Sequence, residues 1–166
     1  MKKIIRNLLF ITVIISALLL SSCGGLEKHS EAGLVFYLPE DMEKINVAYA
    51  DLCFANRDTE FFVYYYSRDE LLTKNFIDKD STSEEYLTDF IAFNGYTNVD
   101  RTYDAEKNIA TAKYIYEDEN TFYFDFVIRN YYVLAHVTMH CDADLRGEYE
   151  RIFDDWAEKI YLEEME

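Results

Sequence analysis

Two histidines and an aspartate near the C-terminal end are the first candidates for chemistry. His136, His140 and Asp142 are residue types that bind zinc. In a strand, residues four apart point the same way but lie about 13 Å from each other, too far to share one ion. In a helix they would meet, but the residues between the histidines lack the glutamate of the zinc-protease signature. We therefore expect two histidines on the polar face of a half-exposed strand, and neither a metal nor another cofactor.

Cys53 and Cys141 are the second candidates. A disulfide between them would stabilise an exported protein by about 4 kcal/mol, provided that their Cα atoms lie within about 7 Å. The alternative, two buried thiols, is favoured because Cys141 shares a strand face with Val137 and Met139. A nucleophilic Cys141 is disfavoured, since the neighbouring His140 would point to the opposite face of the strand.

Other catalytic and metal-binding patterns are incomplete. The acidic stretch that begins at Asp78 resembles a calcium loop, but its sixth position is Ser83 instead of glycine and its twelfth is Asp89 instead of glutamate. The chain has five glycines, with no Gly-x-Ser-x-Gly and no glycine loop for phosphate. Among 32 acidic residues, a pair of carboxylates has no specificity as a glycosidase signal. The sequence therefore favours a protein that is not an enzyme.

Tyrosine is the remaining unusual residue type, with 15 copies. Several tyrosines occur as neighbours in strand-like segments, so they do not all face inward. Exposed tyrosines offer stiff contact area with a polar tip and are typical of interfaces. Tyrosine also suits strands whose outer face is half covered by helices, and this alternative stays open. We predict that Tyr64, Tyr66 and Tyr132 contact a protein partner.

The elements that must position these residues follow from periodicity. Alternating or continuous apolar and aromatic runs predict strands, and apolar residues at helical spacing predict helices. Ser81 and Glu84 form a capping-box pattern at the start of the second predicted helix, and Gly95 marks its end. The predicted order is three strands (34–38, 46–56, 61–66), two helices (68–77, 81–94), four strands (97–103, 109–116, 121–128, 131–141) and a last helix (145–160).

This order resembles the PsbP-like fold. The resemblance depends on an early strand that ends in Leu38-Pro39-Glu40, and on an aromatic strand, acidic turn and amphipathic helix from Tyr131 to Ile160. It covers residues 34–161 and implies an α+β domain in which helices sandwich an antiparallel sheet, a PsbP-like α/β/α sandwich. Members of this group, which includes DcrB-type bacterial lipoproteins, are mostly non-catalytic binding or assembly factors. No functional motif of the group matches here, so no site residues are transferred.

The N-terminus resembles the signal of bacterial lipoproteins. Basic residues precede a mostly apolar stretch from Leu8 to Leu20, which is shorter than the roughly 20 residues of a spanning helix. Leu20-Ser21-Ser22-Cys23 then matches the lipobox, and the resemblance implies that Cys23 is lipidated. The predicted organisation is a signal peptide over 1–22, a tether over 23–33, one domain over 34–161 and an acidic tail over 162–166.

Charge narrows the function further. The formal net charge of −16 disfavours binding to nucleic acid or to anionic lipid by electrostatics, so the lipid would attach the domain to the cell membrane or outer membrane. We expect an envelope lipoprotein that is not a catalyst and binds an unidentified envelope protein in an assembly or accessory role. The alternatives are a lipoprotein that binds a small ligand or metal ion and, third, an unidentified hydrolase.

Overall fold

The structure is a computed structural model that describes residues 25–67, 70 and 80–163. The predicted signal peptide and Cys23 lie outside the described residues, as do nearly all of the predicted helix 68–77 and the last residues of the predicted tail. In the part that the structure describes, no helix is long and apolar enough to cross a membrane.

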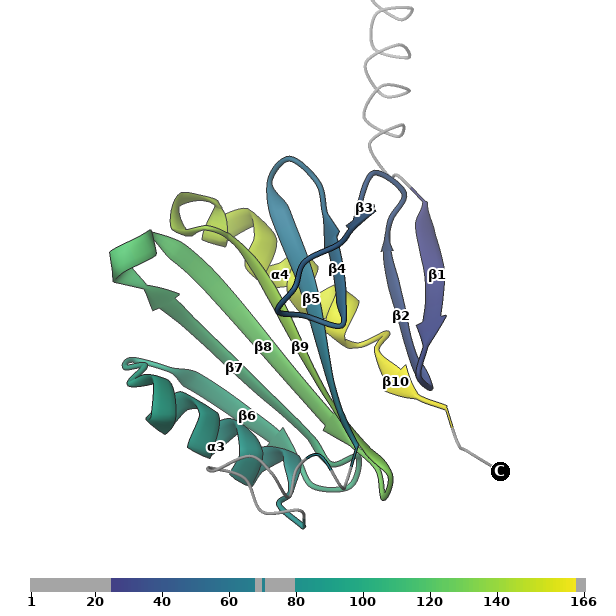
Figure 1. Cartoon of the computed structure of the whole chain (residues 1–166). Helices are drawn as coiled ribbons and strands as arrows, with labels where there is room; N and C mark the ends of the chain where they lie inside the picture. The colour runs from purple at the N-terminus through teal and green to yellow at the C-terminus, as the bar shows by residue number, and fades with distance from the viewer. Residues whose placement is uncertain (1–24, 68–69, 71–79, 164–166) are drawn as a thin grey trace, which may run out of the picture.

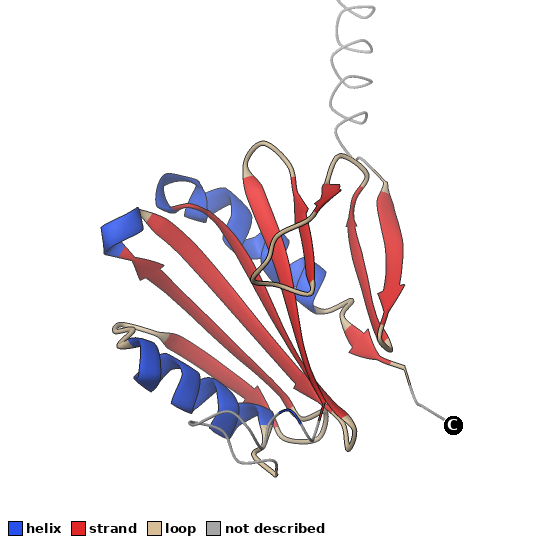
Figure 2. Cartoon of the chain, viewed as in Figure 1, coloured by secondary structure: helices blue, strands red, loops and turns tan. Residues whose placement is uncertain are grey.

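A seven-stranded antiparallel sheet forms the body of the molecule (Figures 1 and 2). Its strand order is β3-β4-β5-β9-β8-β7-β6. Asn108 and Asn120 take the left-handed backbone conformation, with φ of 50° and 51°, in the tight connections on either side of β7. The strands are β3 (Glu43–Ile45), β4 (Leu52–Ala55), β5 (Thr59–Ser67), β6 (Asp100–Asp104), β7 (Ile109–Tyr116), β8 (Thr121–Arg129) and β9 (Val133–Asp142).

A second, three-stranded sheet joins the two ends of the described chain. It consists of β1 (Leu26–Glu31), β2 (Leu34–Pro39) and β10 (Tyr161–Leu162), with β2 in the centre. The prediction of a tether over 23–33 and of a domain that begins at 34 is therefore wrong. Because β1 is an exposed edge strand that pairs along all of β2, it needs few apolar side chains. Its sequence therefore lacks the apolar pattern by which a strand is recognised. Leu162, expected in the tail, belongs to β10.

The two described α-helices pack on opposite faces of the large sheet. They are α3 (Ser83–Asn94) and α4 (Arg146–Ala157); single 3-10 turns occur at η1 (Glu117–Glu119) and η2 (Ala143–Leu145). The capping box of α3 joins Thr82 and Glu85, one residue later than predicted, and Gly95 ends the helix with φ 71°. The α4 face is also covered by β2.

The antiparallel, sheet-dominated α+β fold agrees with the sequence prediction, whereas the predicted element order is wrong in detail. Five strands precede α3 in the described residues, and β10 follows α4. The single strand expected over 46–56 is only the short β4, preceded by β3. The strands that were not predicted, β1, β3 and β10, are edge strands that are either polar or very short, and periodicity identifies such strands poorly.

Candidate functional site

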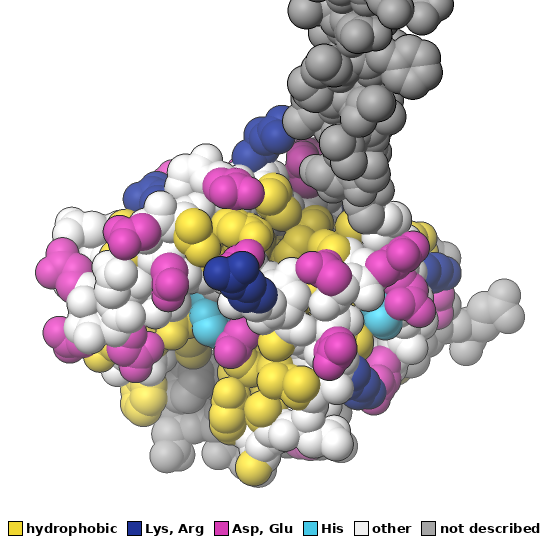
Figure 3. Space-filling model, turned by 90° about the horizontal axis from the view of Figure 1, so that it is seen from above, with side chains coloured by type: hydrophobic (Ala, Val, Ile, Leu, Met, Phe, Trp, Pro, Cys, Tyr) yellow, Lys and Arg dark blue, Asp and Glu magenta, His cyan; other side chains and the backbone are white. Residues whose placement is uncertain are grey.

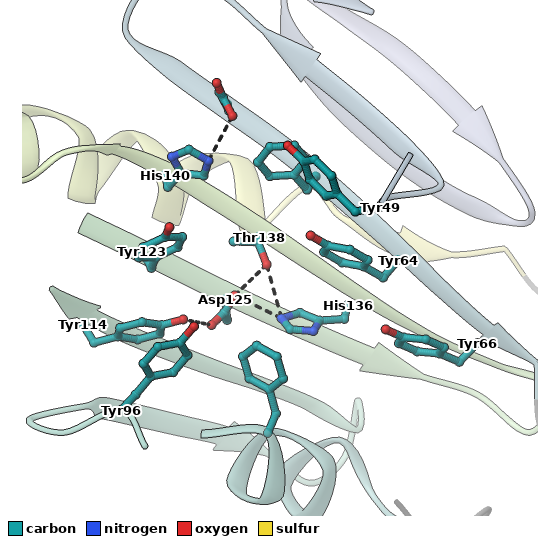
Figure 4. A pocket seen from close by; sticks show the side chains of 13 residues that line it. Tyr49, Tyr64, Tyr66, Tyr96, Tyr114, Tyr123, Asp125, His136, Thr138 and His140 are labelled. Carbon is teal, nitrogen blue, oxygen red and sulfur yellow. Dashed lines mark hydrogen bonds and ion pairs between the residues drawn. The ribbon is translucent and has the colours of Figure 1, made fainter. Parts of the chain in front are cut away.

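A pocket opens on the α3 face of the large sheet, with a volume of about 480 Å³ (Figure 4). Strand register brings its residues together. Tyr64 on β5 is opposite His136 on β9, and Thr138 on β9 is opposite Asp125 on β8. The lining residues are Tyr49, Glu60, Phe62, Tyr64, Tyr66, Phe90, Tyr96, Tyr114, Tyr123, Asp125, His136, Thr138 and His140.

Asp125 forms the floor of this pocket and is 0 % exposed. Its Oδ2 accepts a hydrogen bond from the Tyr114 hydroxyl at 2.8 Å. Its Oδ1 accepts one from the Thr138 hydroxyl at 2.7 Å and lies 3.0 Å from His136 Nε2. Three donors from three different residues thus hold one buried carboxylate, and they use most of its capacity to accept hydrogen bonds.

His136 connects this floor to helix α3. Its side chain is 2 % exposed, and its Nδ1 lies 3.0 Å from the hydroxyl of Tyr86, a buried α3 residue. A neutral imidazole with its proton on Nε2 satisfies both contacts, because it donates to Asp125 and accepts from Tyr86. In a Ser-His-Asp arrangement the group across the imidazole from the carboxylate is the nucleophile. Here it is a phenol packed beneath α3, and burial raises its pKa far above the usual value, so it stays protonated.

Tyrosines form the walls on both sides of this floor. In Figure 4, Tyr49, Tyr64 and Tyr66 lie on one side of Asp125, and three more tyrosines lie on the other. Burial raises the pKa of Tyr64 to about 12, so its hydroxyl is neutral at ordinary pH. On the second wall, Tyr96 and Tyr114 stack at 4.5 Å between ring centroids, and Tyr114 and Tyr123 at 5.4 Å.

The rim of the pocket is acidic. Glu60 Oε2 lies 3.2 Å from His140 Nε2, and the His140 ring stacks on Phe62 at 5.3 Å. Burial lowers the pKa of His140, although Glu60 opposes this shift. The lining residues include two carboxylates and neither lysine nor arginine. Figure 3 shows acidic side chains spread over the face seen from above, with basic ones sparse.

The comparisons with known proteins bear on the fold. No family model matches the chain, and no curated protein matches it. Among solved structures, it is similar to the solution structure of cyanobacterial PsbP (CyanoP) from Synechocystis sp. PCC 6803, with a TM-score of 0.61 and 17 % sequence identity over 84 % of this chain and 93 % of that one. The chain has a PsbP-like fold. This confirms the fold resemblance predicted from the sequence, and at this identity it shows the fold alone.

Within this PsbP-like fold, the three tyrosines predicted to contact a protein partner lie in two different places. Tyr64 and Tyr66 are partly buried and line the pocket, so they do not lie on an outer surface as predicted. Tyr132 is exposed at the turn between β8 and β9 and is not a lining residue. The three tyrosines therefore do not form one surface.

Of the two histidines, His140 is partly exposed on β9 as predicted, whereas His136 differs. His136 is buried, not half-exposed, because α3 covers the polar face of β9 and Asp125 offers a partner on the next strand. Asp142 is exposed and does not join either histidine. In the described residues, no group of three or more His, Cys, Asp or Glu side chains could hold a metal ion.

Cys53 and Cys141 are both free and buried. They lie on β4 and β9, which are separated by β5, so two strand spacings of about 4.8 Å each already exceed the roughly 7 Å limit for a disulfide. They also face opposite sides of the sheet, since Cys53 pairs with Phe62 and Cys141 with Thr59. The two cysteines are thus the buried thiols that the sequence favoured, and the disulfide that it left possible does not form. Burial raises both thiol pKa values to about 11, which leaves the thiols inert.

Sequence reasoning missed the centre of the site. Asp125 stands alone among aromatic and aliphatic residues of β8, and Tyr86 occurs on an ordinary amphipathic helix. One signal was available: a single carboxylate inside a strand that is otherwise apolar on both faces has to find buried partners. The partners themselves come from other elements, and only the strand register identifies them.

Proposed function

We propose that this protein is a non-catalytic lipoprotein of the bacterial envelope that binds a small ligand in the tyrosine-lined pocket. The observation that supports this most is the cavity of about 480 Å³, whose aromatic walls converge on a buried carboxylate. Small-molecule sites are typically concave, mostly apolar and about 300–1,000 Å³ in volume, with a few fixed polar groups. This pocket has all of these features.

The arrangement of the floor supports a binding role over a catalytic one. The polar groups of Asp125, His136 and Thr138 are engaged with one another or with tyrosine hydroxyls. A general base needs a nitrogen or oxygen within hydrogen-bond reach of the substrate. The second imidazole nitrogen of His136 faces Tyr86, which is not a lining residue, and so does not face the pocket.

Attachment to the envelope is part of the same proposal. The lipobox Leu20-Ser21-Ser22-Cys23 supplies it, with Cys23 as the lipidated residue and the cell membrane or outer membrane as the site. The described chain then enters β1 at Leu26, in the three-stranded sheet, which contributes no residue to the pocket lining.

Native mass spectrometry of the full-length protein, purified in mild detergent from its own membranes, tests the binding role. We expect a small molecule to be retained by the wild type. It should be lost from a Tyr64→Ala, Tyr66→Ala double variant, which removes two wall rings. A matched Tyr131→Ala, Tyr132→Ala variant should retain it. A wild type without any bound molecule would contradict the proposal, and so would retention by the pocket variant.

A second candidate, docking of an envelope protein, is supported by one surface feature. Tyr131 and Tyr132 at the β8–β9 turn are 67 % and 55 % exposed, and their rings pack edge to face at 5.0 Å. Crosslinking in native membranes tests this function, with Cys23→Ser as the unanchored control. We expect a partner that is lost from the Tyr131→Ala, Tyr132→Ala variant and kept by the Tyr64→Ala, Tyr66→Ala variant. Any other pattern would reject the turn as the docking site.

A further inference from the structure

The charge of the pocket restricts the class of ligand. Asp125 lies at the floor and Glu60 at the rim, and no lysine or arginine lines the cavity. A buried carboxylate is stable only when other groups compensate its charge. Hydrogen bonds from Tyr114, Thr138 and His136 do this in part, and with the neutral imidazole that satisfies both contacts of His136 they bring no positive charge. An anionic ligand would add a third negative charge to this site, whereas a cation would balance one.

The hydrogen bonds of the site restrict the class further. In the described part of the chain, every fully buried side-chain nitrogen or oxygen already has a hydrogen-bond partner. Asp125 accepts from Tyr114 and Thr138 and pairs with His136, so little of its acceptor capacity remains. At this floor, a sugar or a primary amine would therefore find few open partners for its own O–H or N–H groups when it is desolvated. A cation without N–H groups needs none.

The walls of the pocket are aromatic rings, which bind such a cation. Six tyrosines and two phenylalanines line the cavity, and Figure 4 shows tyrosines on both sides of Asp125. The face of an aromatic ring is negative, and it attracts a cation placed within about 6 Å of its centre. Quaternary ammonium groups are recognised by cages of several aromatic rings.

We infer that the ligand carries a quaternary ammonium group, bound among the tyrosine rings above Asp125. This inference rests on the proposed ligand-binding function and specifies the chemistry of that same site. The rings supply the contact with the methyl groups, and the two carboxylates supply the opposite charge.

Calorimetric titration of the full-length chain in a non-ionic detergent tests the ligand class. Choline is compared with 3,3-dimethylbutan-1-ol, which has the same shape but carbon in place of the charged nitrogen. We expect choline to bind at least tenfold more tightly than the neutral alcohol. Equal affinities, or tighter binding of the alcohol, would overturn the inference.

Two pocket variants and one control locate the binding. Asp125→Asn keeps the shape and removes the charge, so it should weaken choline at least tenfold and change binding of the neutral alcohol little. Tyr64→Leu removes one wall ring but none of the hydrogen bonds that hold Asp125. It is the variant to use if Asp125→Asn does not fold. Tyr132→Leu, the same change outside the pocket, should leave choline affinity unchanged. Binding that Tyr64→Leu leaves unaltered would place the cation elsewhere and reject the inference.

These experiments distinguish an error in the ligand class from an error in the proposed ligand-binding function. If choline does not bind while native mass spectrometry finds another molecule that the Tyr64→Ala, Tyr66→Ala variant loses, the ligand class is wrong and the ligand-binding function stands. If neither a retained molecule nor choline binding is found, both are wrong.

Discussion

The two faces of the seven-stranded sheet are built from the same strands but have different chemistry. On the α4 face, alternate residues of β5, β8 and β9 are mostly apolar, and they belong to the same core cluster as Phe153 and Trp156. On the α3 face, the residues between them include Asp125, His136 and Thr138, with tyrosines around a cavity. One face is packed mainly by hydrocarbon under α4 and β2, with a hollow of about 930 Å³ beside α4, whereas the other is only partly covered by α3 and contains the polar network.

The difference indicates a division of roles along single strands. In β8, Phe124 and Phe126 point into the filled core, and Asp125 between them points to the pocket. A polar network is stable in the interior only when its members are held in fixed positions. The rigid core beneath supplies this fixation. Stability should therefore depend most on the α4 face, and ligand binding on the α3 face.

The largest effect should come from the core of the α4 face. Phe153 is 0 % exposed and packs on Phe122 and Trp156. Phe153→Ala should lower the free energy of unfolding by about 3–5 kcal/mol, because it leaves a cavity. The same change at Phe93, which is 69 % exposed on α3, should have almost no effect. Urea denaturation of both variants measures the contrast, and similar values would contradict the division of roles.

A smaller loss should follow from breaking the floor of the pocket. Asp125→Ala leaves the donors of Tyr114, Thr138 and His136 without their acceptor. Each unpaired buried donor costs about 1–3 kcal/mol. Removal of the buried carboxylate, whose charge is itself costly to desolvate, offsets part of this cost, so the net fall in the free energy of unfolding should be about 1–3 kcal/mol. Denaturation under the same conditions measures it. If Asp125→Ala lowered the free energy of unfolding more than Phe153→Ala does, stability would depend more on the α3 face than on the α4 face, which would contradict the division of roles.

Alkaline pH should destabilise the fold, in part through two buried tyrosines of the α3 face. Burial raises the pKa values of Tyr86 and Tyr114 above the usual 10, so in the folded state they keep their protons when the unfolded chain has lost them. This stabilisation is fully present below pH 10 and is lost as pH rises above it, by about 1 kcal/mol per pH unit for each tyrosine. Denaturation at pH 9 and pH 11 measures the loss.

The control for this prediction is the Tyr86→Phe, Tyr114→Phe double variant, which removes both phenols. Its stability is lower at pH 9 because hydrogen bonds are missing, but it should change less between pH 9 and pH 11. An equal change in both proteins would mean that these tyrosines do not titrate abnormally.

The smallest effect should come from reduction. Because Cys53 and Cys141 lie on opposite faces and form no bond, dithiothreitol should leave the melting temperature unchanged. Differential scanning calorimetry with and without reductant measures this. A decrease of several degrees would show a disulfide and require a different register of β4 or β9.

Sequence alone predicted the regular parts of this fold. The strands near β5, β7, β8 and β9 and the helix near α4 follow from strong apolar periodicity, which reflects local burial. The strand β1 was missed because its pairing with β2, not its side chains, stabilises it. The capping box was shifted because Ser81 and Thr82 each have a glutamate three residues later.

The site was much less predictable. Tyr64 and Tyr66 were singled out, but for an outer surface, because composition does not show which side of a strand is covered. His136 was noticed and Asp125 was not, although each is the partner of the other. Their contact depends on the register between β8 and β9, a property of the paired strands that neither segment contains by itself.

The hairpin of β1 and β2 has a mechanical consequence. Leu26 pairs with Pro39 at one end of the hairpin, and the turn at Ala32 and Gly33 is at the other. A force applied to the chain at Gly25 would break the hydrogen bonds of these pairs one after another, starting at Leu26, so β1 would separate from β2 at low force. The six residues of β1 would then add about 20 Å of extended chain between Gly25 and the rest of the domain. The force would then reach β2, whose Leu34 and Phe36 are fixed in the core, so β1 would absorb tension before it reached the folded body.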